Sequence, residues 1–384
     1  MDELTLRAER IIWRGRALAR HASGQVVIVE PGVFPGEVFK ARVTQRKKDY
    51  LRASPVQIIE GSTSRRPHPC PHAPQCGGCR FGVLPNRVQL ELKRELLERE
   101  LARGLPREVR LPSCLPVKSP KAWRYRWRGQ IHVRDGRPHF KGLQSSRDIH
   151  LEDCYLLAPP LARALKTLSR GLDDGRHTIA ASPVDGQVAA GRSDPDLALP
   201  GTGLPGPFRV PGGSFFQANQ TLNRHLVRTV TSLLEPYHSV ADLYAGCGNF
   251  ALPLAARGKH VLALDSDGSA VAAAKANALE MGLTSLDAAL ADLKKEPVSR
   301  RLDRLRPEAV IVDPPRAGGG RHITGLANLG WLSRIVWVSC DVVNSARDLK
   351  PFLQQGWEVT SLMLFDMFPQ TWHMEAVAVL DRWN

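Results

Sequence analysis

Aromatic residues make up only 6% of the 384 residues, and no uninterrupted apolar run approaches the roughly 20 residues that a membrane-spanning helix requires. The first ten residues mix acidic and basic side chains without an apolar stretch, so a secretory signal is not expected. A cytoplasmic protein without membrane contact is the interpretation that follows. With 43% hydrophobic and 24% charged residues, the composition excludes disordered, collagen-like and coiled-coil chains and suffices for two or three domains.

Acidic residues are scarce relative to basic ones. The chain has 38 Asp and Glu against 53 Lys and Arg, which gives a formal net charge of +15. A polyanion such as RNA or DNA is therefore the expected partner, bound by a monomer. A coding bias that enriches Arg, Ala, Gly and Pro explains the same excess without a functional meaning, and composition alone does not separate the two.

Cysteine is limited to seven residues, and a reducing cytosol disfavours disulfides between them. Cys70, Cys76 and Cys79 lie in one short segment whose intervening glycines permit a tight loop. Clustered thiolates select zinc or an iron–sulfur cluster, and either site needs a fourth ligand. Cys154 and Cys114 are the two candidates. The CX3CX2C spacing of radical enzymes is absent.

Short apolar runs separated by Gly and Pro turns fill residues 9–60, as in segments 25–30 and 37–43. This rhythm is typical of a small closed β-barrel of the OB-like type, which often binds oligonucleotides. Basic residues 46–48, with Tyr50, form a candidate patch for phosphates and base stacking. A charged hairpin edge that keeps the barrel soluble is an equally good interpretation.

Residues 86–104 have the periodicity of an amphipathic helix, with Asn86 as the candidate cap and Gly104 at the end. Its predicted apolar face consists of Val88, Leu92, Leu96, Leu97 and Leu101. From about 110 to 205 the pattern is weaker, and residues 194–207 indicate a surface loop. Residues 123–128 alternate Trp or Tyr with Arg, which suits either a nucleic-acid surface or a strand with inward aromatic rings.

The pattern changes at about residue 215. A predicted helix over 217–234 is followed by short apolar strands that alternate with helices. The strands are expected at residues 240–243, 260–265, 309–313 and 334–340. Continuous apolar strands separated by helices predict a parallel sheet that is covered on both faces.

A glycine-rich segment, Asp242–Phe250, follows a predicted strand and opens a helix. Its glycines would let the backbone approach a ligand at the carboxyl edge of the sheet. The next strand ends at Asp265, which could accept hydrogen bonds from ribose hydroxyls. A dinucleotide and S-adenosylmethionine both fit this pattern, although the missing G-x-G-x-x-G spacing disfavours the dinucleotide.

Three later motifs also carry candidate chemistry. Asp313 and Arg316 flank two prolines, a rigid turn that could hold a carboxylate against a planar base or a methyl donor, or simply end a strand. Cys340 ends another predicted strand and is a candidate nucleophile, although buried cysteine is also a common filler. His373 and Glu375 lie between the last two strands, where either could be a general base or part of a solvated turn.

Taken together, six ordered motifs resemble the RNA 5-methyluridine (uracil-C5) methyltransferase family, in its iron–sulfur branch with an N-terminal TRAM barrel. The resemblance runs from about residue 9 to 382. Besides the cysteine cluster, it rests on Ser214–Asn219, Asp242–Phe250, Asp313–Gly318, Val338–Asp341 and Asp366–Glu375.

The resemblance implies a multidomain fold. It consists of an OB-like TRAM β-barrel that binds RNA over residues 1–62, a small central α+β domain with the iron–sulfur loop over 63–205, and a C-terminal α/β Rossmann-like class I methyltransferase domain over 206–384. S-adenosyl-L-methionine and a [4Fe-4S] cluster are the implied cofactors. RNA is the implied substrate, with 23S ribosomal RNA as first choice and transfer RNA as second.

Residue by residue, the resemblance makes Cys340 the nucleophile and Glu375 the general base. Phe215 matches an aromatic residue near the target base, and we expect Arg126 and Arg128 to contact the RNA beside it. The implied cluster ligands are Cys70, Cys76, Cys79 and Cys154, because segment 145–154 looks like the family segment that ends in the fourth ligand. The implied S-adenosylmethionine site consists of Gln217, Tyr244, Asn249, Asp265, Asp292 and Asp313.

Two positions depart from the family pattern. Val342 stands where proline is usual after the nucleophile motif, and Ala245 stands where a cysteine is frequent in the glycine-rich turn.

Two other functions compete with uridine methylation. Asp313–Arg316 is similar to the tetrapeptides of exocyclic-amine methyltransferases, and a non-catalytic RNA-binding protein could keep the same fold.

Overall fold

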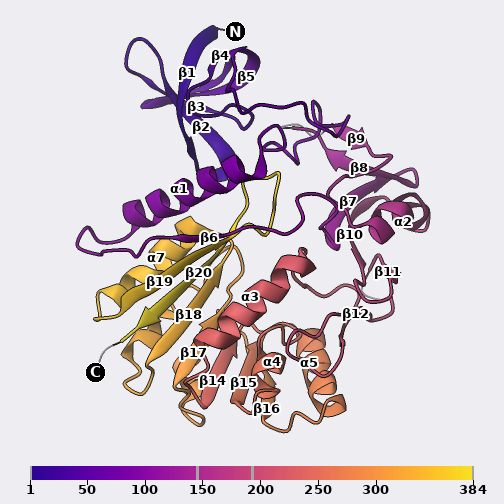
Figure 1. The fold of residues 1–384 in the computed structure, drawn as a ribbon, viewed down its shortest axis with the longest axis vertical. Coiled ribbons are helices and arrows are strands. Elements are labelled where there is room, and N and C mark those ends of the chain that lie inside the picture. The colour runs from indigo at the N-terminus through magenta and orange to yellow at the C-terminus, as the bar shows by residue number, and fades with distance from the viewer. Residues whose placement is uncertain (1, 144–146, 192–193, 383–384) are drawn as a thin grey trace.

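The N-terminal strands close into a five-stranded β-barrel with the neighbour order β1-β2-β3-β5-β4 (Figure 1). In this computed structural model, which describes residues 2–143, 147–191 and 194–382, the strands are β1 (Glu3–Ile12), β2 (Arg16–Arg20), β3 (Val26–Val29), β4 (Val38–Arg46) and β5 (Tyr50–Glu60). Alternate side chains point inward, as along β4, where Phe39, Ala41 and Val43 are buried. The predicted barrel is confirmed, but it begins at Glu3 because β1 pairs with both β2 and β4.

A buried carboxylate fastens the barrel to the segment that leaves it. The side chain of Glu37 is fully buried and accepts hydrogen bonds from the backbone N–H groups of Phe34 (2.9 Å) and Ser62 (3.0 Å). The Arg65 guanidinium donates to Glu37 Oε2 (2.8 Å) and to the Gly32 carbonyl (2.7 Å). Glu37 thus joins the turn before β4 to the chain that follows β5.

A second sheet has the order β11-β10-β7-β8-β9 and carries helix α2 (Pro159–Arg170) on one face (Figure 1). Its core includes Ile131, Leu161, Leu165 and Ile179. The strands are β7 (Arg128–Arg134), β8 (Arg137–Lys141), β9 (Asp148–His150), β10 (Gly175–Ala181) and β11 (Val188–Ala189).

Two expectations for this region are wrong. Residues 123–127 form no strand, and Tyr125 is the fully buried ring among them. Segment 194–207 is not only a surface loop, because β12 (Leu197–Leu199) is buried and pairs with β13 (Phe208–Val210). In both cases the burial comes from neighbours that are distant in sequence, which local alternation does not record.

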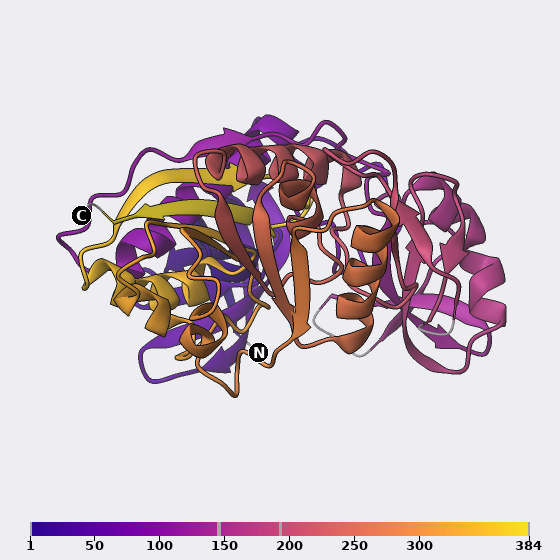
Figure 2. The ribbon, with the colours of Figure 1, turned by 90° about the horizontal axis from the view of Figure 1, so that it is seen from below.

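The C-terminal sheet has eight strands in the order β16-β15-β14-β17-β18-β20-β19-β6 (Figures 1 and 2). Strands β14 to β18 pair in parallel, which confirms the predicted α/β sheet, and β20 runs antiparallel to both of its neighbours. The strands are β14 (Ser239–Leu243), β15 (His260–Asp265), β16 (Leu286–Leu290), β17 (Ala309–Val312), β18 (Arg334–Ser339), β19 (Glu358–Phe365), β20 (Glu375–Asp381) and β6 (Leu115–Val117).

Helices cover both faces of this sheet. One apolar core packs helices α3, α4 and α5 on one face, and another packs α6, a 3-10 segment (Thr324–Asn328) and α7 on the opposite face. Within the described ranges, no helix is long and apolar enough to cross a bilayer. The helices are α3 (Gln220–Leu233), α4 (Ala251–Ala255), α5 (Gly268–Glu280), α6 (Val298–Leu302) and α7 (Val342–Leu353).

Helix α1 (Asn86–Gly104) has the predicted bounds and lies between the barrel and the C-terminal sheet (Figure 1). Asn86 does not cap it, because Pro85 holds that position and the Asn86 side chain accepts a hydrogen bond from Gln370 Nε2 (3.2 Å). The buried face differs from the predicted apolar stripe, since half of its residues are polar. They are Gln89, Lys93, Leu96, Leu97, Glu100 and Leu101.

Strand β6 also joins the C-terminal unit, because it pairs in parallel with β19 at the edge of the eight-stranded sheet. Helix α1 packs into the same core as α7. The predicted boundary at residue 206 therefore leaves α1 and β6 outside the unit with which they pack.

Replacing the buried barrel carboxylate should destabilise the protein strongly. We expect Glu37→Ala to lower the free energy of unfolding by about 3–5 kcal/mol, because it leaves Arg65 and two backbone N–H groups without their acceptor. Glu60→Ala is the matched control, since its ion pair with Arg7 is exposed and should contribute at most about 1 kcal/mol. Urea denaturation followed by circular dichroism tests this, and equal losses in both variants would contradict it.

Candidate active site

Three strands of the C-terminal sheet bring a thiol and two carboxyl groups to one edge. Asp313 directly follows β17, Cys340 directly follows β18, and Glu375 is the first residue of β20. Strand β20 pairs antiparallel with β18 so that Ser339 lies opposite Ala376. The carboxyl ends of β17 and β18 therefore meet the start of β20, at the edge where open α/β sheets bind ligands.

Burial sets the protonation of these three groups. Loss of hydration raises the pKa of the Cys340 thiol to about 12, and the negative charges of Glu375 and Asp313 act in the same direction. Burial also raises the pKa of Asp313 to about 7. It raises the pKa of Glu375 well above the usual glutamate value, with a further contribution from Asp313. Near pH 7, the neutral forms of Cys340 and Glu375 are therefore favoured.

Arg316 supplies the opposing charge. Its guanidinium lowers the pKa of both Cys340 and Glu375, against the effect of burial. The Arg316 backbone is held by Asn344 of helix α7, whose side-chain amide donates to the Arg316 carbonyl at 2.7 Å. The sequence interpretation used this arginine only as part of a motif. Its position directly after a carboxylate and two prolines was the available signal that it reaches the site.

His373 lies in the loop before Glu375 but is poorly suited to accept a proton. Its ring centroid lies 3.9 Å from that of Trp372 and 5.9 Å from that of Phe368. Burial lowers the pKa of His373 to about 3, and nearby cations including Arg316 act in the same direction. Of the two bases that the sequence left open, Glu375 is therefore the stronger proton acceptor.

The glycine-rich turn after β14 forms as the sequence predicts. Asp265, at the end of β15, accepts hydrogen bonds from the N–H groups of Gly246 and Asp267, both at 2.8 Å. Gly248 has a φ of 92°, and a Cβ atom there would lie 2.8 Å from the Leu252 side chain. Each Asp265 oxygen keeps a lone pair for a further donor such as a ribose hydroxyl.

Tyr244 and Asp292 lie beside this turn. The Tyr244 hydroxyl donates to the Gly319 carbonyl at 3.2 Å, and burial raises the pKa of this phenol, with smaller contributions from nearby carboxylates that include Asp265 and Asp292. Asp292 follows β16 and lies 3.1 Å from the Lys295 ammonium. Tyr244, Asp265 and Asp292 thus converge at the ends of three adjacent strands.

Asn249 has a bracing role within the turn. Its side-chain amide exchanges two hydrogen bonds with Asn223 of helix α3, at 2.8 and 3.2 Å. Gln217 is buried just before α3, where its backbone carbonyl accepts a hydrogen bond from Gln220 Nε2 at 2.6 Å. Asn249 therefore joins α3 to the turn, whereas Gln217 lines the neighbouring cavity.

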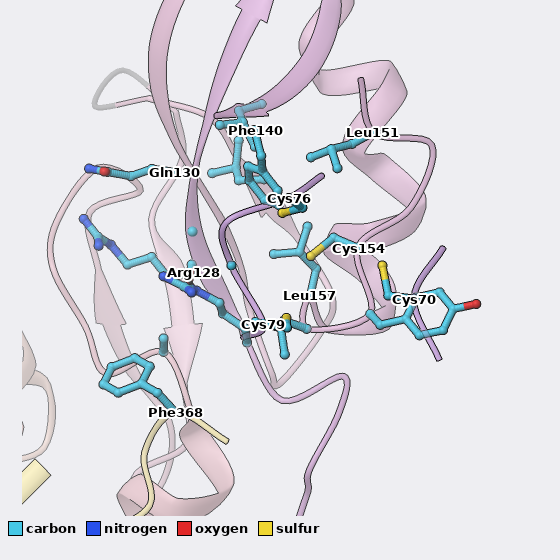
Figure 3. Close-up of a pocket in the computed structure, with 18 of the residues that line it drawn as sticks. Cys70, Cys76, Cys79, Arg128, Gln130, Phe140, Leu151, Cys154, Leu157 and Phe368 are labelled. Atoms are coloured by element: carbon cyan, nitrogen blue, oxygen red, sulfur yellow. Dashed lines mark hydrogen bonds between the residues drawn. The ribbon is translucent and has the colours of Figure 1, made fainter. Parts of the chain in front are cut away.

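This cavity, of about 580 Å³, lies between the central sheet and the C-terminal unit. Four cysteines line one part of it, and their sulfur atoms point toward a common space (Figure 3). Arg128 and Phe368 lie on another side of the same cavity (Figure 3). The polar and aromatic lining also includes Arg126, Phe215, Gln217 and Arg316. The predicted cysteine site and the predicted RNA-contacting residues therefore share one space.

The four cysteines are Cys70, Cys76, Cys79 and Cys154, as the resemblance implied. Burial raises the pKa of the Cys79 thiol, and negative charge on the other three cysteines adds to this effect. Cys114, the competing fourth ligand, is buried elsewhere, close to the Glu98 carboxylate. Segment 145–154 begins with two residues that lie outside the described part of the chain.

A single metal ion is not supported at this position. Among the described residues, no group of three or more Cys, His, Asp or Glu side chains is arranged to hold one ion. A lone zinc ion requires all of its sulfur ligands at roughly 2.3 Å from one point. The described residues therefore show four cysteines around one cavity and no preformed metal site, for zinc or for a cluster.

Phe215 presents an exposed ring beside the cavity, with 65% of its surface accessible. The Arg128 guanidinium lies 5.2 Å from the centre of this ring, and its Nε donates to the Ser214 carbonyl at 3.3 Å. Arg126 in turn donates to the Arg128 carbonyl at 3.0 Å. The arrangement offers a stacking face backed by a cation.

Comparison with known proteins gives matches along the whole chain. A family model described as tRNA (Uracil-5-)-methyltransferase matches residues 202–383. The 23S rRNA (uracil(1939)-C(5))-methyltransferase RlmD of Shewanella sediminis is 30% identical over 99% of this chain and 96% of its own length. The enzyme of the same name from Pseudomonas aeruginosa is 31% identical over 98% of this chain and 93% of its own.

The chain belongs to the RNA uracil-C5 methyltransferase family.

Among solved structures, the tRNA (uracil-54, C5)-methyltransferase of Pyrococcus abyssi in complex with S-adenosyl-L-homocysteine has a TM-score of 0.74. It is 22% identical, and the match covers 98% of this chain and 99% of that one. At this identity the similarity establishes the fold, from the barrel through to the last strand. The uracil-C5 methyltransferase architecture thus extends over the whole chain and not only over the region matched by the family model.

The sequence missed the residues that hold the loop of this uracil-C5 methyltransferase between β19 and β20. The solvated turn considered for this loop is wrong, since Asp366, Gln370 and Thr371 are buried. Gln89 and Lys93 of helix α1 donate to the loop from below the barrel. Gln89 and Lys93 each directly follow a residue of the predicted apolar face of this helix. This position was the available signal that their polar side chains are buried.

The raised pKa of Cys340 predicts how its reactivity depends on pH. Because only the thiolate reacts, we expect alkylation of Cys340 by iodoacetamide to accelerate about tenfold per pH unit from pH 7 to 9, without a plateau. Mass spectrometry of the peptide that contains Cys340 measures this rate separately from the other cysteines. A plateau below pH 9 would show that the thiol ionises far more easily than its burial implies.

Proposed function

We propose that this enzyme transfers a methyl group from S-adenosylmethionine to C5 of a uridine in 23S ribosomal RNA. The observation that supports this most directly is the placement of Cys340 beside Glu375 at the carboxyl edge of the sheet. At the same edge, the glycine-rich turn lies two strands from that of Cys340 and Asp265 lies three strands from it, where a methyl donor would bind.

Uridine methylation at C5 needs a nucleophile because this carbon does not attack a methyl group unaided. The Cys340 sulfur adds to C6 of the uracil ring, and the π electrons shift toward C5 and O4. C5 then bonds to the methyl group, and the sulfonium leaves as a neutral thioether. Glu375 removes the C5 proton, the C6–S bond breaks, and the ring is restored with Cys340 again a thiolate.

The electrostatics of the site suit these steps. Arg316 stabilises the anionic form of Cys340, which burial otherwise disfavours, so thiolate formation depends on this cation. The raised pKa of Glu375 strengthens it as a proton acceptor once it is ionised. Gln217 is our candidate donor to the developing charge on O4, because it is buried in the wall of the cavity.

Five residues are proposed to position the methyl donor beside C5. Asp265 would accept hydrogen bonds from the ribose, while Tyr244 and Asp292 would flank the nucleoside at the ends of the neighbouring strands. Asn249 would hold the turn in place through Asn223. Asp313 would face both the donor and the base, because it follows the strand between β14 and β18.

The RNA substrate must expose its target base to reach this edge. Phe215 offers an exposed ring on which a base can stack, at a gain of about 1–3 kcal/mol per base. That gain offsets part of the few kcal/mol needed to unstack the uridine. Arg126 and Arg128 would contact the adjacent phosphates, and the barrel, as a TRAM-like domain, would bind a more distant part of the RNA.

Ribosomal RNA is preferred over transfer RNA as the substrate. The full-length relatives at 30–31% identity are named as enzymes of 23S rRNA, whereas the transfer-RNA enzyme of known structure is 22% identical. Transfer RNA remains the second candidate. An exocyclic-amine substrate is disfavoured, because that reaction gives Cys340 no role.

The four cysteines of the cavity are proposed to hold a [4Fe-4S] cluster. Cys70, Cys76, Cys79 and Cys154 line one cavity and offer four thiols, the number such a cluster takes. When bound, the cluster supplies a cross-link between the loop that contains Cys70 and the segment that contains Cys154. With four cysteine ligands, the role of the cluster would be structural.

Two variants test the covalent mechanism. We expect Cys340→Ala to abolish 5-methyluridine formation in 23S RNA and Glu375→Gln to lower turnover about 10²- to 10⁴-fold. With RNA that carries 5-fluorouridine at the target, the fluorine cannot leave as a proton would, so an adduct on Cys340 should persist on a denaturing gel. Cys114→Ser is the matched control and should form the adduct normally. An active Cys340→Ala enzyme would instead favour the exocyclic-amine reaction.

Metal analysis tests the cluster. Protein purified without oxygen should contain about four irons and four sulfides per chain and should absorb visible light. Cys154→Ser should lose iron and absorbance, whereas Cys114→Ser should keep both, because Cys114 lies away from the cavity. One bound zinc per chain, or unchanged iron in Cys154→Ser, would refute the assignment.

A further inference from the structure

In the loop that leads into Glu375, the backbone carbonyls of four consecutive residues all accept hydrogen bonds. Residues 367–370 lie between β19 and β20, and each of their carbonyl oxygens accepts a hydrogen bond from a different part of the chain. The pairs are Asn219 Nδ2 to Met367 (3.3 Å), Lys93 Nζ to Phe368 (3.0 Å), the Tyr125 hydroxyl to Pro369 (3.0 Å) and the Phe81 N–H to Gln370 (2.9 Å). Such a loop has little freedom to move.

Lys93 makes the strongest of these contacts. Its ammonium and the Asp366 carboxylate are both fully buried, with Nζ 2.6 Å from Oδ1. Asp366 is the first residue of the loop, and the same ammonium also reaches the Phe368 carbonyl. One side chain of helix α1 therefore fixes two points of the loop that are two residues apart.

Gln89, four residues before Lys93, makes a second, neutral clamp. Its Nε2 donates to Gln370 Oε1 and its Oε1 accepts the Gln370 N–H, both at 2.8 Å. Gln370 has a φ of 71°, a left-handed backbone conformation that residues other than glycine rarely adopt. The two hydrogen bonds from Gln89 hold the backbone in this conformation.

These contacts reach Glu375 from both ends of the loop. Glu375 is the first residue of β20 and pairs with Phe365, the neighbour of Asp366, so the position of its carboxylate depends on how both ends of the loop are held. A general base must lie within hydrogen-bond reach of the proton that it removes, and a displacement of about 1 Å can lower a rate by up to about 10²-fold.

We propose that Lys93 and Gln89 are positioning residues that place Glu375 for removal of the C5 proton. This inference rests on the proposed role of Glu375. A purely structural role is the alternative, since a buried ion pair can often be replaced by apolar side chains at little cost in stability. The two roles differ in which step of the reaction fails.

The step can be identified with unmodified uridine RNA. Addition of Cys340 and methyl transfer precede proton removal, so an enzyme with a misplaced base should stall as a methylated protein–RNA adduct. We expect Lys93→Met and Gln89→Ala to accumulate this adduct on denaturing gels, with turnover lowered about tenfold or more and the KM for RNA unchanged. Glu375→Gln provides the reference level of adduct.

Arg334→Met is the matched control. Arg334 pairs with Asp381 at 2.6 Å, at the opposite end of β20 from Glu375, and the pair is partly buried. This variant loses an ion pair on the same strand without touching the loop, so it should lose stability but accumulate no adduct.

These experiments distinguish failure of the positioning role of Lys93 and Gln89 from failure of the proposed role of Glu375. Absence of adduct in Glu375→Gln would overturn the proposed role of Glu375 itself. Adduct in Glu375→Gln but none in Lys93→Met and Gln89→Ala would overturn the positioning role alone. If Lys93→Met does not fold, Gln89→Ala decides, because it removes two hydrogen bonds without leaving a buried charge unpaired. Equal adduct in Arg334→Met would show that general destabilisation is sufficient.

Discussion

Partial loss of hydration at the carboxyl edge of the C-terminal sheet is the constraint on which the site depends. Asp313, Cys340 and Glu375 are brought together there by three adjacent strands, and burial raises the pKa of all three. In water, a thiol and two carboxyl groups would ionise independently. In this setting their charges are coupled to one another and to Arg316, so that ionising one group changes the others.

The parts of the chain meet at the loop between β19 and β20. Helix α1 contacts it through Gln89 and Lys93, and the segment after the cysteine loop contacts it through Phe81. The barrel contributes Trp13, whose ring centroid lies 4.9 Å from that of Trp372 in the loop. The barrel, helix α1 and the segment after the cysteine loop thus share one structural junction with the proposed base, which keeps its position fixed relative to all of them.

Much of the site was predictable because its residues lie at strand ends. Parallel strands place their carboxyl ends together, so Asp265, Asp313 and Cys340 could be brought to one edge from their positions in the sequence. The buried contacts of Gln89 and Lys93 with the loop between β19 and β20 were not predictable in this way. Lys93 lies on a helix that local periodicity describes as amphipathic, and its partner Asp366 lies far along the chain. Charged residues are rarely buried, so sequence patterns place them on the surface.

The sequence by itself determined the family, the order of the elements and the identities of the chemical groups, because these follow from local motifs and short-range periodicity. Only the tertiary structure decided which groups meet. It placed Cys154, which the resemblance had implied, in the cysteine cavity, lowered the pKa of His373, and brought β6 to the edge of a sheet formed by residues that follow it much later. Burial and long-range contact depend on the whole fold, and no local stretch of residues encodes them.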